Sequence, residues 1–195
     1  MTDHGYKSNQ DPYCYPQTSV LRNRLGFCTQ NELDNHEALA TASRFADPFP
    51  AGTFDITHYR AIHKHLFHDV FDWAGEYRTV RIGKGGNMFC YPEYIESEMK
   101  RLFEKRGQRL LDGPNTRAQY AKRASLFLAE LNAIHPFREG NGRAQLAYLT
   151  LLSTHIGHPL RQDTFEPEKF LEAMIASFRG NATLLERCST GEYNP

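Results

Sequence analysis

The sequence predicts a mostly α fold, and two features of its hydrophobic pattern carry that prediction. Apolar residues recur at three- and four-residue steps over most of the second half of the chain, which is the spacing of helices buried on one face. Alternation typical of a strand occurs in one place, where Val80 and Ile82 alternate with polar neighbours. We therefore expect a helical domain with one β-hairpin.

Residues that begin or end regular structure delimit the first elements. A Pro/Gly loop at 47–55 precedes a helix over 58–67, for which Thr57 is the expected cap. The hairpin follows over 77–91, and its two arms meet at a glycine-rich turn, 83–87.

Four further helices are expected downstream of the hairpin. The first runs over 92–110, and the second begins after a Thr116 cap and ends at His135. The third runs over 142–155, and the fourth starts within 166–168 and ends at Phe178 or Arg179. The second of these must end at His135, because Pro136 disfavours a helical conformation in the residue before it.

Composition bounds the function. The chain has 195 residues, 40% of them hydrophobic, which suffices for one domain with its own core. Lys plus Arg (23) equals Asp plus Glu (23), so no global field steers the protein onto nucleic acid or an anionic membrane. The N-terminal residues lack the apolar run of a signal peptide, and we expect a cytoplasmic protein with neither nucleic acid nor membrane as partner.

Metal sites of the closed, cysteine-based kind are not expected. The four cysteines are far apart, and none has a neighbour at zinc-ligand spacing. His65 and His68 would share one helix face at the end of the 58–67 helix. A solvated helix face is a simpler interpretation of them than a metal site.

The loop at 135–143, His-Pro-Phe-Arg-Glu-Gly-Asn-Gly-Arg, lies between the two most hydrophobic helices. Gly140, Asn141 and Gly142 allow a tight turn that aims backbone N–H groups at an anion, and the following helix adds its positive N-terminal end. Arg143 offers a fork of donors, and the amide of Asn141 is a further donor. This pattern predicts a phosphate-binding loop.

Two other residues of the loop suggest reaction chemistry. Glu139 is the hard oxygen ligand that Mg²⁺ takes alongside phosphate oxygens, and His135 is suited to remove a proton from a hydroxyl at neutral pH. A plainer alternative is a helix–loop–helix corner, in which His135 caps a helix and Glu139 pairs with Arg143 on the surface.

The same nine residues resemble the signature of the Fic family, His-x-Phe-x-(Asp/Glu)-Gly-Asn-Gly-Arg-x-x-Arg. Members transfer a nucleotide monophosphate, usually AMP from ATP, to a protein hydroxyl. The resemblance extends over about 54–178, and residues 11–26 resemble those of bacterial Fic toxins. It implies a Fic-type helical bundle with a hairpin flap, divided into an N-terminal extension packing on the core (1–53), the core (54–179) and a C-terminal tail (180–195).

The resemblance also implies a role for each residue of the loop. His135 would be the general base for a Tyr, Ser or Thr hydroxyl of a target protein, and Glu139 would hold Mg²⁺. Gly140, Asn141 and Gly142 would bind the α- and β-phosphates of ATP, and Arg143 would neutralise the β-phosphate as pyrophosphate leaves.

The hairpin has a counterpart in the flap that docks the target in this family. Its residues here are Val80, Arg81, Ile82, Gly83 and Lys84. They would hold a target segment as an added strand through main-chain hydrogen bonds. A hairpin that only protects the site is the alternative.

One position departs from the signature, because its closing arginine falls on Leu146. In the family that arginine grips the γ-phosphate, and a charged hydrogen bond of this kind contributes about 1.5–3 kcal/mol. Three alternatives to efficient AMP transfer therefore stay open: another phospho-donor, low activity, or nucleotide binding without catalysis.

The family's inhibitory motif, (Ser/Thr)-x-x-x-Glu-(Gly/Asn), has no match in the chain. The resemblance therefore implies a separate small antitoxin protein and a bacterial toxin or translocated effector. Topoisomerase subunits are plausible targets.

Overall fold

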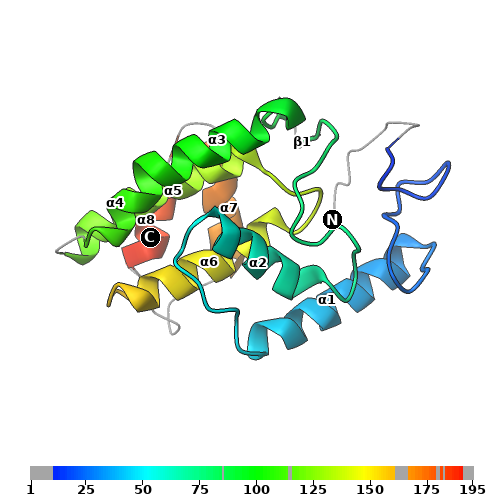
Figure 1. Cartoon of the computed structure of the whole chain (residues 1–195), viewed down its shortest axis with the longest axis horizontal. Helices are drawn as coiled ribbons and strands as arrows, with labels where there is room; N and C mark the ends of the chain where they lie inside the picture. Colours follow the sequence, from blue (N-terminus) through cyan, green and yellow to red (C-terminus); the bar gives the residue numbers. More distant parts are fainter. Residues whose placement is uncertain are drawn as a thin grey trace.

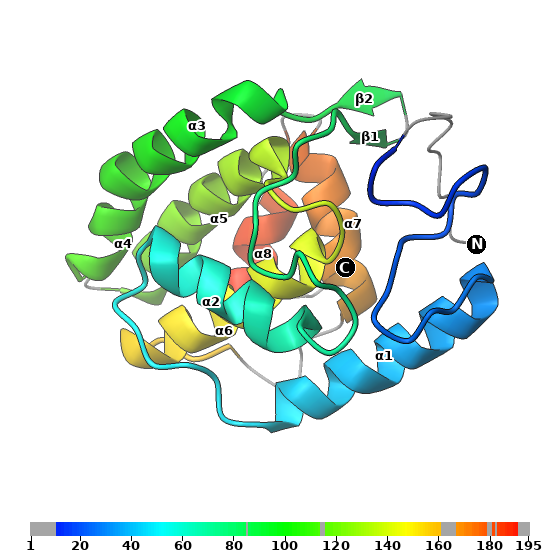
Figure 2. The ribbon, with the colours of Figure 1, turned by 45° about the vertical axis from the view of Figure 1, so that its right-hand side comes forward.

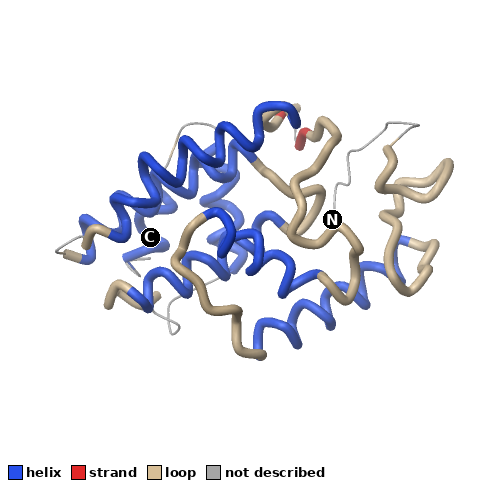
Figure 3. Tube along the Cα trace, viewed as in Figure 1, coloured by secondary structure: helices blue, strands red, loops and turns tan. Residues whose placement is uncertain are grey.

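The structure is a computed structural model that describes residues 11–84, 86–113, 116–160, 167–178, 181 and 183–190. Helices dominate it, as the hydrophobic pattern predicts (Figures 1 and 3). The longer helices are α1 (Gln30–Ala46), α2 (Ile56–Phe67), α5 (Arg117–Ile134), α6 (Asn141–His155) and α7 (Pro167–Phe178). The shorter ones are α3 (Ile95–Leu102), α4 (Gln108–Leu111) and α8 (Thr183–Thr190).

Helix α5 is the centre of the bundle. It contacts α3, α4, α6, α7 and α8, while α2 packs on α6 and α1 packs on α2 (Figure 1). Aromatic side chains fill the space between these helices, with Tyr59, Phe127, Phe137 and Tyr148 almost completely buried. The core thus lies directly behind the loop that joins α5 to α6.

Two predicted helix boundaries differ from those observed. The expected Thr57 cap is wrong, because the Asp55 carboxylate accepts the His58 N–H at 2.8 Å and the helix begins at Ile56. The expected 92–110 helix is interrupted by a 3₁₀ turn at its start and by a π-helical turn, Phe103–Gly107. Helices α1 and α8 were not predicted, since polar residues interrupt the apolar spacing of both.

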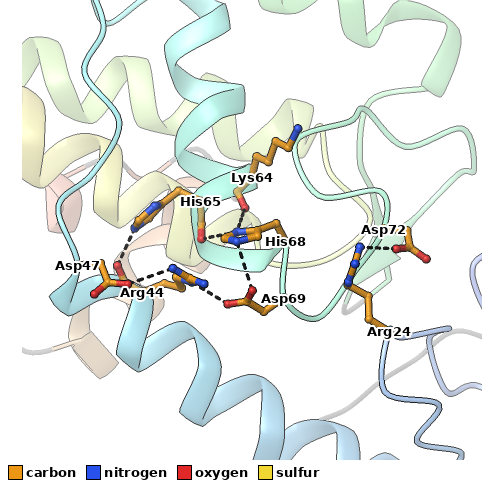
Figure 4. Close-up of polar contacts among 8 residues, drawn as sticks. All are labelled: Arg24, Arg44, Asp47, Lys64, His65, His68, Asp69 and Asp72. Atoms are coloured by element: carbon orange, nitrogen blue, oxygen red, sulfur yellow. Dashed lines mark hydrogen bonds and ion pairs between the residues drawn. The ribbon is translucent and has the colours of Figure 1, made fainter.

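Polar contacts join α1 to α2 and to the turn that follows it (Figure 4). Arg44 pairs with Asp69 at 2.7 Å and with Asp47 at 3.1 Å. His65 Nε2 lies 2.8 Å from the Arg44 carbonyl, and His68 Nε2 lies 3.2 Å from Asp69. The solvated face expected for these two histidines is therefore wrong for His65, which joins α2 to α1. His68 contacts its own turn and the adjacent Asp69, and its side chain stays partly exposed. Within the described residues, no cluster of three or more His, Cys, Asp or Glu side chains could hold a metal ion.

The hairpin is present but short (Figure 2). Strands β1 (Gly83–Lys84) and β2 (Asn87–Met88) pair in antiparallel fashion, which is less than the alternation had suggested. Further down the arms, the Val80 carbonyl, which the next hydrogen bond of this ladder would use, accepts from the side chain of Arg78. Among the described helices, none is both long and apolar enough to cross a membrane.

Candidate active site

The loop between α5 and α6 begins with an unusual backbone conformation. His135 ends α5 in the left-handed region, with φ 50° and ψ 63°, and its N–H donates to the Leu131 carbonyl at 3.0 Å. Residues other than glycine adopt this region rarely, and the cost is about 1–2 kcal/mol. Surrounding contacts must therefore hold His135 in place, as is common at functional sites.

The His135 ring is fixed with one nitrogen available. Its Nδ1 lies 3.2 Å from the Asn132 carbonyl, a contact that requires a proton on Nδ1 and leaves Nε2 as the acceptor. Phe89 stacks on the ring, with centroids 3.8 Å apart. Desolvation by these neighbours lowers the pKa of His135 from 6.5 to about 3, and the charges of Arg78 and Lys84 act in the same direction. The imidazole is therefore neutral at physiological pH and can accept a proton.

Asn141 closes the loop onto itself. Its Oδ1 accepts the Phe137 N–H at 2.9 Å, and its Nδ2 donates to the Phe137 carbonyl at 2.8 Å. The side-chain amide expected to reach a phosphate is thus engaged within the loop. The first backbone bond into α6 runs from Ala144 N–H to the Gly140 carbonyl, so the N–H groups of Asn141, Gly142 and Arg143 lie at the open end of the helix.

Glycine stands at positions 140 and 142 of the loop for different reasons. Gly140 has φ +79°, and a Cβ there would lie 2.3 Å from the Phe67 ring, so the fold itself requires glycine. At Gly142 a Cβ would meet nothing within 4 Å. The packing of the protein does not require glycine at 142, whereas close approach of a ligand to the backbone would.

A buried histidine supports the loop from α2. The ring of His63 stacks on Phe137 at 3.7 Å, its Nδ1 accepts the Gly75 N–H at 2.9 Å, and its Nε2 lies 3.0 Å from the Glu139 carbonyl. Burial lowers the pKa of His63 to about 3, so the ring is neutral and Nε2 is the donor. Sequence alone did not identify this residue as part of the site, because nothing distinguishes it from the other histidines of α2.

Arg143 lies between two carboxylates at the N-terminus of α6. Its Nη2 lies 3.5 Å from Glu139 Oε1 and also pairs with the carboxylate of Glu37 on α1. The guanidinium lies 4.7 Å from the centre of the Phe67 ring. Glu37 is 7% exposed, and desolvation raises its pKa, with the Arg143 charge opposing. Glu139 is half-buried and also accepts the Gly140 N–H at 2.9 Å. Glu37 was missed because α1 itself was not predicted.

The N-terminal segment is tied to the same loop. Arg138 donates to Asp11 from Nε at 3.0 Å and Nη2 at 2.8 Å, and both side chains are less than a tenth exposed. Tyr13 Oη accepts the Thr79 N–H at 3.1 Å, which joins the segment to the base of the hairpin as well.

Leu146 lies one turn further along α6 than Arg143. Its side chain is half-buried and packs against the hydrophobic core. The chain thus carries an apolar contact where the signature has its second arginine.

Together, the helical fold and this loop define a domain with a neutral imidazole at one end of the loop and, at the other, an open helix N-terminus of the kind that suits a phosphate. Comparison with known proteins gives the family: residues 53–153 match the model of the Fic/DOC family, and the chain belongs to it.

Curated relatives align over most of the chain. One is "Probable protein adenylyltransferase y4lH" of Sinorhizobium fredii (strain NBRC 101917 / NGR234), 52% identical over 90% of this chain and 92% of its own length. Another is "Probable protein adenylyltransferase Fic" of Escherichia coli (strain K12), 33% identical over 93% of this chain and 91% of its own. A solved structure, the N-terminal Fic domain of a VirB-translocated Bep effector protein of Bartonella quintana with bound ADP, is similar with a TM-score of 0.78. It is 25% identical, with 91% of this chain and 92% of that one covered.

Proposed function

We propose that the protein is an adenylyltransferase that moves AMP from ATP to a Tyr, Ser or Thr hydroxyl of a target protein. The observation that carries the proposal is the neutral imidazole of His135, with Nε2 left as acceptor, on the same short loop as the open N-terminus of α6. Family membership and relatives named protein adenylyltransferases support it.

The proposed step is an in-line substitution at the α-phosphorus. As the target oxygen forms its bond to phosphorus, His135 Nε2 accepts the hydroxyl proton, and the bond from the α-phosphorus to the bridging oxygen breaks. Pyrophosphate leaves with the electron pair of that bond. The backbone N–H groups of Asn141 and Gly142 bind the α- and β-phosphates, and Arg143 neutralises the charge on the leaving group. Gly140, whose own N–H donates to Glu139, provides the tight turn that presents them.

The donor set suits Mg²⁺ as the partner of ATP. A half-exposed carboxylate, Glu139, lies beside the helix end where the phosphates would bind, and Mg²⁺ commonly takes one or two carboxylates with phosphate oxygens as its remaining ligands. When bound, the ion would supply charge neutralisation to the phosphates. Glu139 would hold it.

We assign target docking to the hairpin. Its arm over Val80, Arg81, Ile82, Gly83 and Lys84 leads into β1, and a two-stranded sheet leaves outer edges that can pair with a further strand. Main-chain pairing requires little of the target sequence, which suits an enzyme that positions a hydroxyl rather than reading a motif.

Leu146 favours a second candidate, a Fic-fold transferase with another phospho-donor. The half-buried leucine offers no charge to a γ-phosphate, so the site has less reason to prefer a triphosphate. An experiment with labelled donors separates AMP transfer from this alternative. Labelled ATP, UTP or CDP-choline is supplied with Mg²⁺ to the wild type and to Leu146→Arg in a bacterial lysate. Label from ATP alone supports AMP transfer, whereas label from another donor supports the alternative.

Control by a separate antitoxin and delivery into another cell belong to the same proposal. The chain lacks the family's inhibitory motif, and one relative of known structure is a translocated effector. Co-expression with the product of a short neighbouring gene tests the first point: restored growth and a stable complex support it, and unchanged growth opposes it.

A further inference from the structure

Arg78 lies where the hairpin, the end of α5 and the loop meet. It is 2% exposed and donates hydrogen bonds to the backbone carbonyls of four described residues. Two bonds go to the end of α5: Nε to His135 at 2.8 Å and Nη2 to Ile134 at 3.1 Å. The other two go to the two arms of the hairpin: Nη1 to Val80 at 2.7 Å and Nη2 to Cys90 at 2.6 Å.

These contacts meet a specific need at the end of α5. The last carbonyls of a helix have no partner within it, and a cation is favoured beside them. The planar guanidinium, with five N–H donors, can serve several carbonyls that diverge from one point, which a lysine ammonium does less well. The backbone of Arg78 adds a bond from its N–H to the Pro136 carbonyl at 2.9 Å.

The returning arm of the hairpin also contacts the end of α5 directly, without Arg78. Cys90 N–H donates to the Ala133 carbonyl at 3.1 Å, and Phe89 N–H donates to the Ile82 carbonyl at 3.1 Å. The Phe89 ring covers one face of the His135 imidazole. The hairpin and His135 therefore share one set of contacts.

We infer that Arg78 is a positioning residue that couples the hairpin to His135, so that the surface that docks the target and the base that accepts its proton are set by one buried guanidinium. This inference rests on the proposed function. It explains how a strained histidine conformation is maintained beside a hairpin that has little pairing of its own.

The test compares Arg78→Lys and Arg78→Met with a matched control, Arg60→Lys. Arg60 also donates to a backbone carbonyl ahead of the hairpin strands, that of Gly75 at 2.8 Å, and lies over the Tyr77 ring, but these contacts reach neither β1, β2 nor His135. Proteins labelled with ¹³C and ¹⁵N at histidine report the His135 ring, and hydrogen exchange reports the amides of Phe89 and Cys90.

In both Arg78 variants we expect the His135 resonance to shift and the two amides to exchange faster by about tenfold or more, while exchange in α7 and the affinity for Mg²⁺-ATP stay as in the wild type. Arg78→Lys should show the smaller change. Unaltered His135 resonance and amide exchange in a folded variant would overturn the inference, as would equal effects from Arg60→Lys. If Arg78→Met fails to fold, Arg78→Lys alone decides.

Transfer activity separates this inference from the proposed function. In a wild type that modifies proteins, the Arg78 variants should lose about a hundredfold in kcat/KM for the target with an unchanged Kd for ATP, because small misplacements of a base are costly. Full transfer activity in Arg78→Met would overturn the coupling. If the wild type transfers nothing, the proposed function fails, and the resonance and exchange measurements still decide whether Arg78 sets His135.

Discussion

Phe89 and His135 lie face to face, with ring centroids 3.8 Å apart and planes 11° from parallel. The phenyl ring comes from the returning arm of the hairpin, and the imidazole ends α5. Because one face of the imidazole is covered and Nδ1 faces the Asn132 carbonyl, a target hydroxyl must reach the ring at its Nε2 edge. The contact also keeps water from part of the ring, and so adds to the burial that lowers the pKa of His135.

Replacing Phe89 by leucine should raise the pKa of His135 toward 6.5. Burial is the main cause of the lowered pKa, and loss of the stacked ring admits water. The Cε1–H resonance of His135, followed by NMR over pH, measures the change. Phe89→Tyr retains the stacked ring and should keep the wild-type titration. An unchanged pKa in Phe89→Leu would show that other neighbours desolvate the ring.

Alanine at Gly142 and at Gly140 should have opposite effects on stability. Gly142→Ala should stabilise the protein by about 0.5 kcal/mol, because a Cβ fits without contact and alanine favours a helix. Gly140→Ala should destabilise it by about 3 kcal/mol, through the positive φ and the clash with Phe67. Urea unfolding measures both.

Only Gly142→Ala then tests the phosphate site. We expect a folded protein whose affinity for Mg²⁺-ATP, measured by calorimetry, falls about tenfold or more, because a methyl group occupies the space beside the helix end. Wild-type affinity in this variant would mean that the phosphates bind elsewhere.

Loss of Arg143 should destabilise the protein as well as impair nucleotide binding. Arg143→Ala leaves the carboxylate of Glu37 buried without this cation, at a cost of about 1–2 kcal/mol since the arginine is partly exposed. Adding Glu37→Gln should recover about half of that loss. A double-mutant cycle by urea unfolding measures the coupling, and strictly additive effects would contradict it.

His63 should make stability depend on pH. Burial lowers its folded-state pKa to about 3, while the unfolded chain titrates near 6.5, so its contribution is complete above pH 6.5 and is lost as pH falls toward 3. Between pH 7.5 and 5.0 the wild type should lose about 2 kcal/mol more than His63→Gln. The free energies of unfolding at the two pH values provide the comparison. Equal losses would show that His63 takes up a proton in the folded state.

The parts of the site that follow one another in sequence were predictable, because a run such as 135–143 carries its chemistry in adjacent residues. The helix-forming pattern likewise predicted α5 and α6, with Pro136 marking where the first ends. Contacts from distant segments were not predictable. Glu37 reaches Arg143 across 106 positions of the sequence, and Asp11 reaches Arg138 across 127.

Other residues changed their expected part once the fold was known. The side chain of Asn141 serves the loop, because a planar amide can satisfy both the N–H and the carbonyl of Phe137. The alternation around Val80 and Ile82 suggested longer strands, but Arg78 takes the Val80 carbonyl, which the next hydrogen bond of the ladder would use. Neither effect leaves a mark in local spacing.

The most direct test of the central claim is transfer of label from ATP carrying it on either the α- or the γ-phosphate, with Mg²⁺, to proteins of a bacterial lysate. We expect label from α-phosphate on a discrete protein, none from γ-phosphate, and none from either with His135→Ala. Label from γ-phosphate, or α-label that persists in His135→Ala, would contradict AMP transfer by His135.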